Sequence, residues 1–361
     1  MNRIPIYQPS LTGNEKKYVM DCLDSTWISS KGKYVEIFEE QFSDYIGTEY
    51  GVAVTNGTVA LHLALLALGI GAGDEVIVPT FTYIASVNVV KYVGAVPVFV
   101  DSKMDSWQMN PEDIVKKITS RTKAIISVHL YGHPCEIVLI KEIAEKNNLF
   151  LIEDCAEAIG SKYKGNKVGT YGDISCFSFF GNKTITCGEG GMALTNNSFL
   201  SEKMVRIKSQ GLAPKREYWH DMIGYNYRMT NICAAIGVAQ LEQIDTFIKR
   251  KIEIGEMYSN YLKKLPLKMH EPVGEVLHTF WMCSLLVGNP KDRDLLRNHL
   301  AKTGIETRPT FYPIHTMPMY SDKYQSFPIA EHLGWSGINL PSWPNLTDKQ
   351  VRYVCEMIQL Y

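Results

Sequence analysis

Ser178-Phe179-Phe180-Gly181-Asn182-Lys183-Thr184-Ile185-Thr186-Cys187-Gly188-Glu189-Gly190-Gly191 connects two apolar segments of the chain. The segment before the turn, residues 174–180, is rich in aromatic and β-branched residues and predicts a buried strand. The glycines that follow predict a tight turn before a second strand at residues 192–195. A lysine held in a dry, rigid turn can lose its proton and attack a carbonyl group, whereas a lysine in an open loop is simply solvated. This segment alone favours the solvated lysine, and the rest of the sequence decides whether Lys183 has a chemical role.

Short apolar segments that alternate with helical patterns precede this turn. The segments predicted as strands are residues 51–54, 75–78, 96–100, 124–128 and 150–152. Residues 58–68 are apolar on nearly every side, which predicts a buried helix. Asn110 and Pro111 predict a helix start, because asparagine caps a helix and proline suits its first turn. This alternation predicts an α/β fold with a mainly parallel sheet covered on both faces, in which ligands bind beyond the carboxyl ends of the strands.

The pattern changes in the last third of the chain. A long helical stretch is expected from about residue 230 to residue 262, then a strand at 279–287 and a helix at 292–303. Thr347 and Gln350 have the spacing of a capping box, which predicts the start of a final helix. We therefore expect a large domain over residues 1–245, with a helical N-terminal segment, and a smaller C-terminal α/β domain over residues 246–361.

Composition limits the classes of function. The 361 residues include 37 basic and 38 acidic side chains, a formal net charge of -1, so no overall field attracts nucleic acid or an anionic membrane. The longest apolar stretch, residues 59–70, is well short of the roughly 20 residues that cross a bilayer, and the N-terminus lacks the apolar core of a signal peptide. Eight cysteines occur without a C-x-x-C pair or a His/Cys cluster at metal spacing. We expect a cytoplasmic protein with reduced thiols and no metal.

Several polar groups near predicted strand ends could lie close to Lys183. Asn56-Gly57-Thr58 precedes the buried helix, and such a turn can bind phosphate or merely cap the helix. Asp154 follows the strand at 150–152, where a buried carboxylate needs a cationic partner or a capping role. Tyr83 follows another strand and could lie over a planar ligand or pack in the core.

Two further residues complete this set. Ser178 could contribute a hydroxyl to a phosphate site or bond the backbone, and Glu157 could face the same pocket or begin a helix. A lysine, an aspartate, a phosphate turn, an aromatic ring and a serine are together the parts of a pyridoxal 5'-phosphate (PLP) site. In such a site the lysine holds the aldehyde as an imine, while the aspartate keeps the ring nitrogen protonated. The joint interpretation therefore outweighs the separate ones.

The sequence resembles the DegT/DnrJ/EryC1/StrS family of sugar-nucleotide aminotransferases over nearly its whole length. These proteins have the aspartate-aminotransferase fold, PLP-dependent transferase fold type I. The resemblance rests on the segments Asn56-Gly57-Thr58-Val59-Ala60-Leu61, Pro79-Thr80-Phe81-Thr82-Tyr83, Glu153-Asp154-Cys155-Ala156-Glu157-Ala158, Phe177-Ser178-Phe179-Phe180-Gly181-Asn182-Lys183, Gly188-Glu189-Gly190-Gly191 and Gly224-Tyr225-Asn226-Tyr227-Arg228-Met229-Thr230.

The resemblance implies a role for each candidate residue. Lys183 would bind the cofactor and carry protons, Asp154 would pair with the pyridine nitrogen, and Tyr83 would stack on the ring. Gly57, Thr58 and Ser178 would hold the phosphate. Asn226 would reach the phosphate bound by the other protomer, which implies a homodimer with shared active sites. Glu157 would contact the ring hydroxyl, although many relatives carry glutamine or histidine there.

The resemblance also implies a substrate. The expected reaction transfers an amino group from L-glutamate to C4 of GDP-4-keto-6-deoxy-D-mannose, through the pyridoxamine form of the cofactor, to give the O-antigen precursor GDP-perosamine. Ser29 and Lys31 in a polar loop, together with Tyr312 and His315, are candidates for the sugar and diphosphate, because lysine can bind phosphate and tyrosine or histidine can bind hydroxyls. A surface loop and packed aromatic rings are the alternatives for these four residues.

Other functions remain to be weighed against this one. The same chemistry could act on a UDP- or dTDP-linked keto sugar, or at C3. A dehydratase of the same fold is disfavoured, since the relatives of that kind replace the lysine with histidine. A non-catalytic regulator that keeps the fold is disfavoured by the intact set of Lys183, Asp154 and Ser178.

Overall fold

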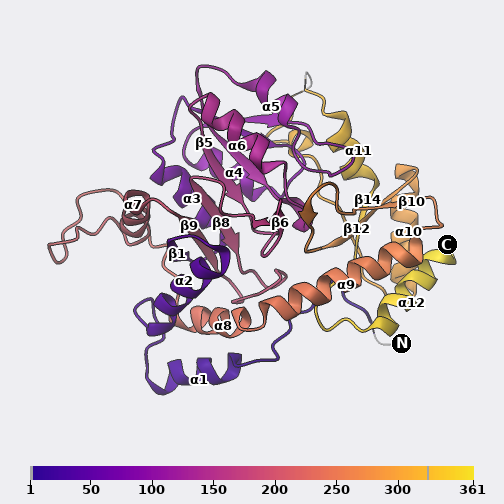
Figure 1. Ribbon diagram of the computed structural model, residues 1–361, viewed down its shortest axis with the longest axis horizontal. Helices are drawn as coiled ribbons and strands as arrows, with labels where there is room; N and C mark the ends of the chain where they lie inside the picture. The colour runs from indigo at the N-terminus through magenta and orange to yellow at the C-terminus, as the bar shows by residue number, and fades with distance from the viewer. Residues whose placement is uncertain (1–2, 323–324) are drawn as a thin grey trace.

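The computed structural model describes residues 3–322 and 325–361, and a seven-stranded sheet forms its centre (Figure 1). The strands lie in the order β1 (Tyr50–Val54), β9 (Gly191–Thr195), β8 (Ile174–Ser178), β5 (Phe150–Asp154), β4 (Thr122–Val128), β2 (Glu75–Pro79) and β3 (Val96–Val100). Only the pairings of β9 with β1 and β8 are antiparallel; all other neighbours in this sheet are parallel. The predicted α/β fold with a mainly parallel sheet is therefore confirmed.

Helices cover both faces of this sheet, because successive side chains of each strand point to opposite sides. In β2, Val76 and Val78 join the core under α3 (Gly57–Ala67), α4 (Ala85–Tyr92) and α7 (Ser198–Lys208), whereas Ile77 joins the core under α5 (Pro111–Lys117) and α6 (Ile137–Lys146). Farther along the second face, β8 and β9 pack against α2 (Lys33–Ile46) and α8 (Asn231–Leu241), beside which lies α1 (Glu15–Asp24). As predicted, α3 is buried on nearly every side, and Asn110 caps α5.

A smaller antiparallel sheet lies in the C-terminal part of the chain. Its order is β10 (Leu267–Met269), β12 (Cys283–Val287), β14 (Gly337–Leu340) and β13 (Arg308–Pro309). The helices α9 (Ile244–Leu262), α10 (Pro290–Lys302) and α12 (Asp348–Gln359) pack with it in one apolar core, and α12 begins with the predicted capping box. Ile4 joins the same core and pairs with Ile305. The N-terminal segment thus reaches the smaller sheet, and a domain boundary at residue 245 stays a prediction.

The remaining elements are short. They are α11 (Pro328–Ser336), the one-turn helices η1 (Leu130–Gly132) and η2 (Ile314–Thr316), and a third sheet of β11 (Val276–Leu277), β6 (Lys162–Tyr163) and β7 (Asn166–Lys167). Within the described residues, no helix combines the length and apolar character that a membrane crossing needs.

Two predicted elements differ from the structure. The helical stretch expected over residues 230–262 is divided between Leu241 and Ile244, where the side chains of Gln240 and Gln243 both bond to Glu15 of the N-terminal segment. The strand expected at 279–287 begins only at Cys283. Phe280 has a left-handed φ of 49°, which a strand cannot contain.

Candidate active site

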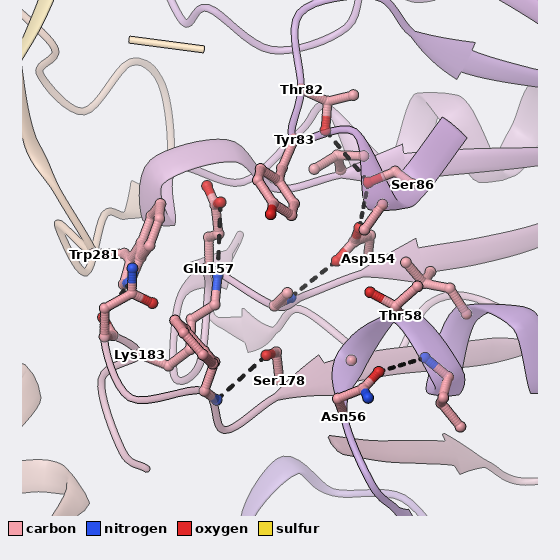
Figure 2. A pocket seen from close by; sticks show the side chains of 18 of the residues that line it. Asn56, Thr58, Thr82, Tyr83, Ser86, Asp154, Glu157, Ser178, Lys183 and Trp281 are labelled. Atoms are coloured by element: carbon pink, nitrogen blue, oxygen red, sulfur yellow. Dashed lines mark hydrogen bonds and ion pairs between the residues drawn. The ribbon is translucent and has the colours of Figure 1, made fainter. Parts of the chain in front are cut away.

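A cavity of about 570 Å³ opens at the carboxyl ends of the large sheet's strands (Figure 2). Asp154 and Ser178 are the last residues of β5 and β8, while Asn56 and Tyr83 follow β1 and β2. The ends of parallel strands share one edge of a sheet, so residues distant in sequence meet there. Seven residues singled out from the sequence line this one cavity: Gly57, Thr58, Tyr83, Asp154, Glu157, Ser178 and Lys183.

The turn before α3 has the form of an anion site. The Asn56 side chain accepts a hydrogen bond from the Val59 amide at 2.9 Å and so caps the helix. A Cβ atom at Gly57 would lie 2.7 Å from the Ser178 Cβ, so only glycine lets β8 approach the helix N-terminus this closely. Backbone amides at the positive end of α3, with the hydroxyl groups of Thr58 and Ser178, can bind a phosphate group.

Asp154 is a buried carboxyl group with polar neighbours. One oxygen accepts a hydrogen bond from the Ser86 hydroxyl at 2.7 Å, and the other accepts one from the Ala156 amide at 3.1 Å. Burial raises the pKa of Asp154 above its usual range, although these hydrogen bonds lower it. No cation in the described part of the chain forms an ion pair with it. The carboxylate therefore suits a ligand that brings a positive charge, such as a protonated ring nitrogen.

Lys183 lies against a second carboxyl group and an aromatic face. Its Nζ is 3.7 Å from Oε1 of Glu157 and 4.0 Å from the centre of the Trp281 ring. Figure 2 shows these three side chains beside one another. Burial lowers the pKa of Lys183, while Glu157 and Asp154 act in the opposite direction. Burial also raises the pKa of Glu157 to about 7, and its other oxygen accepts a hydrogen bond from the Tyr131 amide at 2.9 Å. Both shifts favour the uncharged pair, in which Lys183 is a nucleophile.

Replacing Glu157 by glutamine should change how stability depends on pH. The folded-state pKa of Glu157 is about 7 against an ordinary value of 4.5, so its carboxyl group binds a proton more tightly in the folded protein. The stability that this proton binding gives the folded protein is fully present below about pH 4.5 and is lost as the pH rises through about 7. Relative to the wild type, Glu157→Gln should therefore gain about 1 to 3 kcal/mol of unfolding free energy between about pH 5 and about pH 8.

Urea unfolding of the cofactor-free protein across this range measures the difference. Glutamine keeps an oxygen for the Tyr131 amide, so loss of that hydrogen bond does not obscure the result. Glu153→Gln is the matched control, because the pKa of this other buried glutamate is lowered. The pKa of Glu153 lies below its ordinary value of 4.5, so its contribution to stability changes only below about pH 5, and the curve of Glu153→Gln should run parallel to that of the wild type across this range. Parallel pH curves for the wild type and Glu157→Gln would contradict the shift at Glu157.

Other residues around the cavity were not singled out from the sequence. They include Ser86, which bonds Asp154, and Trp281, which lies against Lys183. Trp281 falls in the segment 279–287 that predicts a strand, and nothing in that pattern points to a ligand site. Phe311 also lines the cavity, with its ring centre 5.5 Å from that of the half-exposed Tyr83. The need of buried Asp154 for a hydrogen-bond donor is the one signal that could have identified Ser86.

The four proposed substrate residues do not line this cavity. His315 is buried, with its ring nitrogens facing Thr80 at 2.7 Å and Glu331 at 3.2 Å, so both nitrogens are already engaged. The Tyr312 hydroxyl accepts a hydrogen bond from Arg293 at 3.3 Å, and its ring packs against Trp335. Both side chains pack against neighbours in this structure, and their roles in substrate binding stay predictions.

The loop before α2 and the segment around Asn226 also lie outside the cavity lining. Ser29 and Lys31 lie in the exposed loop before α2. Asn226 is exposed, and its side-chain oxygen accepts hydrogen bonds from Arg228. The functional roles of Asn226, Ser29 and Lys31 stay predictions.

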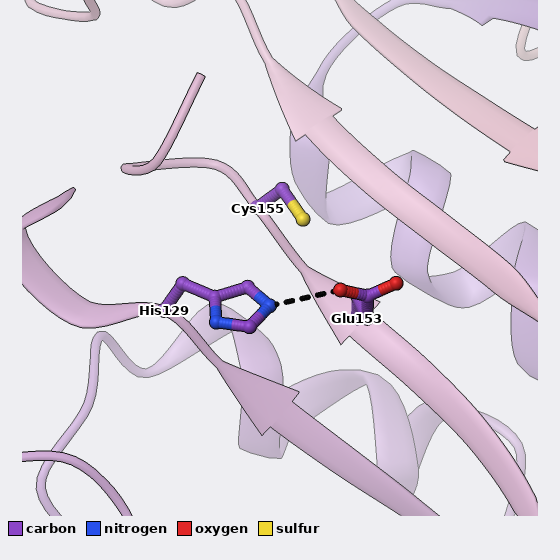
Figure 3. Close-up of side chains that lie close together, drawn as sticks. All are labelled: His129, Glu153 and Cys155. Carbon is purple, nitrogen blue, oxygen red and sulfur yellow. Dashed lines mark hydrogen bonds and ion pairs between the residues drawn. The ribbon is translucent and has the colours of Figure 1, made fainter. Parts of the chain in front are cut away.

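One group of metal-type side chains occurs in the described residues, namely His129, Glu153 and Cys155 (Figure 3). The nitrogens of His129 and the carboxylate of Glu153 are already engaged. His129 faces Glu153 with one nitrogen at 3.1 Å and accepts a hydrogen bond from the Cys135 amide with the other. Glu153 also accepts hydrogen bonds from the amides of Gly169, Tyr171 and Gly172. We interpret this group as a structural network that holds the ends of β4 and β5 together.

Comparison with known proteins adds to this geometry. The family model of the DegT/DnrJ/EryC1/StrS aminotransferase family matches residues 9–359. The chain is 63% identical to a GDP-perosamine synthase of Escherichia coli O157:H7, with 99% of this chain and 98% of that protein covered. It is 50% identical to a GDP-perosamine synthase of Vibrio cholerae, with 99% of each covered.

Solved structures agree with the sequence comparisons. The PLP form of the putative sugar aminotransferase Spr1654 of Streptococcus pneumoniae has a TM-score of 0.94 and 29% identity, covering 99% of this chain and 98% of that one. A PMP form of the same protein is also known. The match over nearly the full length, together with the cavity at the strand ends, leads to one conclusion: the chain belongs to the DegT/DnrJ/EryC1/StrS aminotransferase family.

Proposed function

We propose that this protein transfers an amino group from L-glutamate to C4 of GDP-4-keto-6-deoxy-D-mannose, giving GDP-perosamine and 2-oxoglutarate. The observation that carries the proposal is the 63% identity, over 99% of the chain, to the GDP-perosamine synthase of E. coli O157:H7. The proposed setting is the cytoplasm, where a nucleotide sugar for O-antigen would be made. The eight free cysteines support a reducing compartment.

We propose PLP as the cofactor, because the residues of the cavity fit its parts. Asp154 is a buried carboxyl group without an ion-pair partner in the described chain, which suits the ring nitrogen. The N-terminus of α3 and the hydroxyl groups of Thr58 and Ser178 suit the phosphate, because β8 comes close to this turn at Gly57. Tyr83 would lie over the ring. When bound, PLP supplies an electron sink that stabilises negative charge on the carbon losing a proton.

Lys183 would carry out the proton transfers. Its buried amine is favoured in the neutral form, so Nζ can take a proton from the reacting carbon of glutamate and deliver one to C4 of the sugar. Oε1 of Glu157 faces Nζ at 3.7 Å and can hold a proton near neutral pH. The indole of Trp281 covers one side of Nζ and excludes water there. Glutamate and the keto sugar would react one after the other, and Nζ of Lys183 would carry the protons in both reactions.

A homodimer with shared active sites would complete the cavity. Among the described residues, the lining of the cavity contains three carboxyl groups, those of Asp154, Glu157 and Glu189, and one cation, Lys183, although the substrate carries a diphosphate. We propose that Asn226 of the partner subunit reaches the cofactor phosphate. Ser29 and Lys31 are exposed and would be available to a nucleotide that extends from the cavity toward the partner.

The nucleotide preference provides the test. Purified protein with glutamate should form 2-oxoglutarate from GDP-4-keto-6-deoxy-D-mannose with a kcat/KM at least about 100-fold above that for the UDP- and dTDP-linked 4-keto sugars. The position of the new amine is read from the NMR spectrum of the product. Equal turnover of all three substrates would contradict the GDP assignment, and an amine at C3 would contradict the proposed position.

A further inference from the structure

Lys251 of α9 is a fully buried lysine that the proposed chemistry does not use. Its Nζ donates hydrogen bonds to the carbonyl oxygens of Trp281 and Ser342, both at 2.9 Å, and to the Ser342 hydroxyl at 2.5 Å. No carboxylate forms an ion pair with Lys251 in the described residues. Burial lowers the pKa of Lys251 to about 8, as expected for an ammonium group without a nearby anion. An apolar side chain would fill this position at less cost, so the three hydrogen bonds need an explanation.

The first hydrogen bond fixes a residue of the active site. Lys251 holds the backbone of Trp281, while the Trp281 side chain donates a hydrogen bond from Nε1 to the carbonyl oxygen of Asn182 at 2.8 Å. The face of the same indole lies 4.0 Å from Nζ of Lys183, and Figure 2 shows the ring beside Lys183 and Glu157. One side chain thus contacts both the amine of Lys183 and the peptide just before it.

The two hydrogen bonds to Ser342 connect Lys251, through that residue, to the N-terminal segment. Ser342, which Lys251 bonds through both oxygens, donates its own amide to the carbonyl oxygen of Ile6 at 3.1 Å. The neighbouring Tyr7 donates its hydroxyl to the carbonyl oxygen of Lys183, and its ring centre is 5.6 Å from Nζ of Lys251. The carbonyl oxygens of Asn182 and Lys183 are therefore both held by side chains from segments that meet at Lys251.

The backbone around Trp281 has no regular structure to hold it. Phe280 has a φ of 49°, and β12 begins only at Cys283. A Cβ atom at Gly132 would lie 2.9 Å from the amide nitrogens of both Phe280 and Trp281, so the segment passes unusually close to η1. Without ladder hydrogen bonds, the orientation of Trp281 depends on the few groups that contact it, among them Lys251.

We propose that Lys251 is a positioning residue for amino transfer: it anchors the Trp281 backbone so that the indole covers Nζ of Lys183, and with Tyr7 it fixes the turn that carries Lys183. The inference rests on the proposed function for the role of Lys183. Loss of the Lys251 ammonium would allow Trp281 to turn away, admit water to the amine and shift the turn. Small displacements of a reacting group lower kcat strongly and affect substrate binding less.

The test compares Lys251→Met, Trp281→Phe and the double variant, all loaded with PLP. Methionine keeps the length of the stem without the ammonium, and phenylalanine keeps a ring without the N–H group. Lys251→Met should lower kcat by about 10- to 100-fold with little change in KM. It should also move the pH midpoint of the absorbance band of the Lys183-bound cofactor. If Lys251 acts through Trp281, the double variant should be no slower than Lys251→Met alone, within about twofold.

Lys208→Met is the matched control, because Lys208 is a buried lysine that bonds Glu39 and the Ala53 carbonyl oxygen, and these groups lie outside the cavity. It should be destabilised while kcat and the absorbance midpoint stay at wild-type values. A folded Lys251→Met variant with wild-type kcat and a wild-type absorbance midpoint would overturn the inference. A double variant whose loss of kcat equals the product of the losses in Lys251→Met and Trp281→Phe would also overturn it. If Lys251→Met does not fold, kcat and the absorbance midpoint are measured for Ser342→Ala, which lacks the hydroxyl that Lys251 bonds. A smaller loss of kcat with a smaller shift of the midpoint supports the inference, and wild-type values overturn it.

The outcome is separable from that of the proposed function. A wild-type protein that binds PLP but does not use the GDP-linked sugar would contradict the substrate assignment. The effect of Lys251→Met on the absorbance midpoint would still test the positioning role, because that band depends on Lys183 and not on the sugar.

Discussion

Lys183→Ala should reduce glutamate-dependent formation of 2-oxoglutarate by at least about 10⁴-fold, because the variant loses both the nucleophile and the proton carrier. The fold should survive, since the contact of 3.7 Å with Glu157 is the only ion pair that the Lys183 side chain forms within residues 3–322 and 325–361. Without the ammonium, Glu157 can take up a proton at neutral pH, as burial already favours its neutral form. PLP should still bind through the phosphate site, but its absorbance band should be that of a free aldehyde.

Lys103→Ala provides the control for this variant. Lys103 also pairs with a glutamate, Glu136, but beside a second cavity whose lining shares no residue with the first. The Lys103→Ala variant should keep wild-type activity and the wild-type absorbance band of the cofactor. If Lys183→Ala kept both the wild-type spectrum and measurable amino transfer, the assignment of Lys183 would be wrong.

The convergence of side chains on Lys183 could be predicted because it depends on strand direction alone. Asp154 and Ser178 end neighbouring parallel strands, and Gly57 begins a helix after β1, which runs in the same direction as β8 on the other side of β9. Their positions therefore follow from the order and direction of the strands. The residues of the cavity that come from strand ends were therefore accessible from the sequence.

Trp281 could not be predicted in the same way. Its segment has the apolar composition of a strand, but it passes close to η1 at Gly132, Phe280 has a left-handed φ, and β12 begins only at Cys283. The break between α8 and α9 has a similar origin, since Glu15 draws Gln240 and Gln243 to the N-terminal segment. Tertiary contacts of this kind override local preference and leave no periodic signal in the sequence.

Asp154→Asn should lower kcat by about a thousandfold while the protein stays folded and binds PLP. The substitution removes a negative charge and keeps the shape of the side chain. An asparagine can still accept the hydrogen bond from the Ala156 amide, and its amide group can donate to the Ser86 hydroxyl. What it cannot do is hold a proton on the ring nitrogen of the cofactor. The expected loss therefore lies in the proton-transfer steps of both half-reactions, which rapid mixing with glutamate alone would measure without any sugar substrate.

Two further variants separate the charge of Asp154 from its hydrogen bonds. Ser86→Ala removes the hydrogen bond of 2.7 Å but leaves the carboxylate, so a loss of only about tenfold is expected. Asp173→Asn makes the same chemical change at the opposite end of β8, where Asp173 accepts the Leu151 amide, and it should be fully active. Equal losses in Ser86→Ala and Asp154→Asn would mean that the hydrogen bond, and not the charge, supports catalysis. In that case the ring nitrogen would need no proton from this chain, and the role assigned to Asp154 would be wrong.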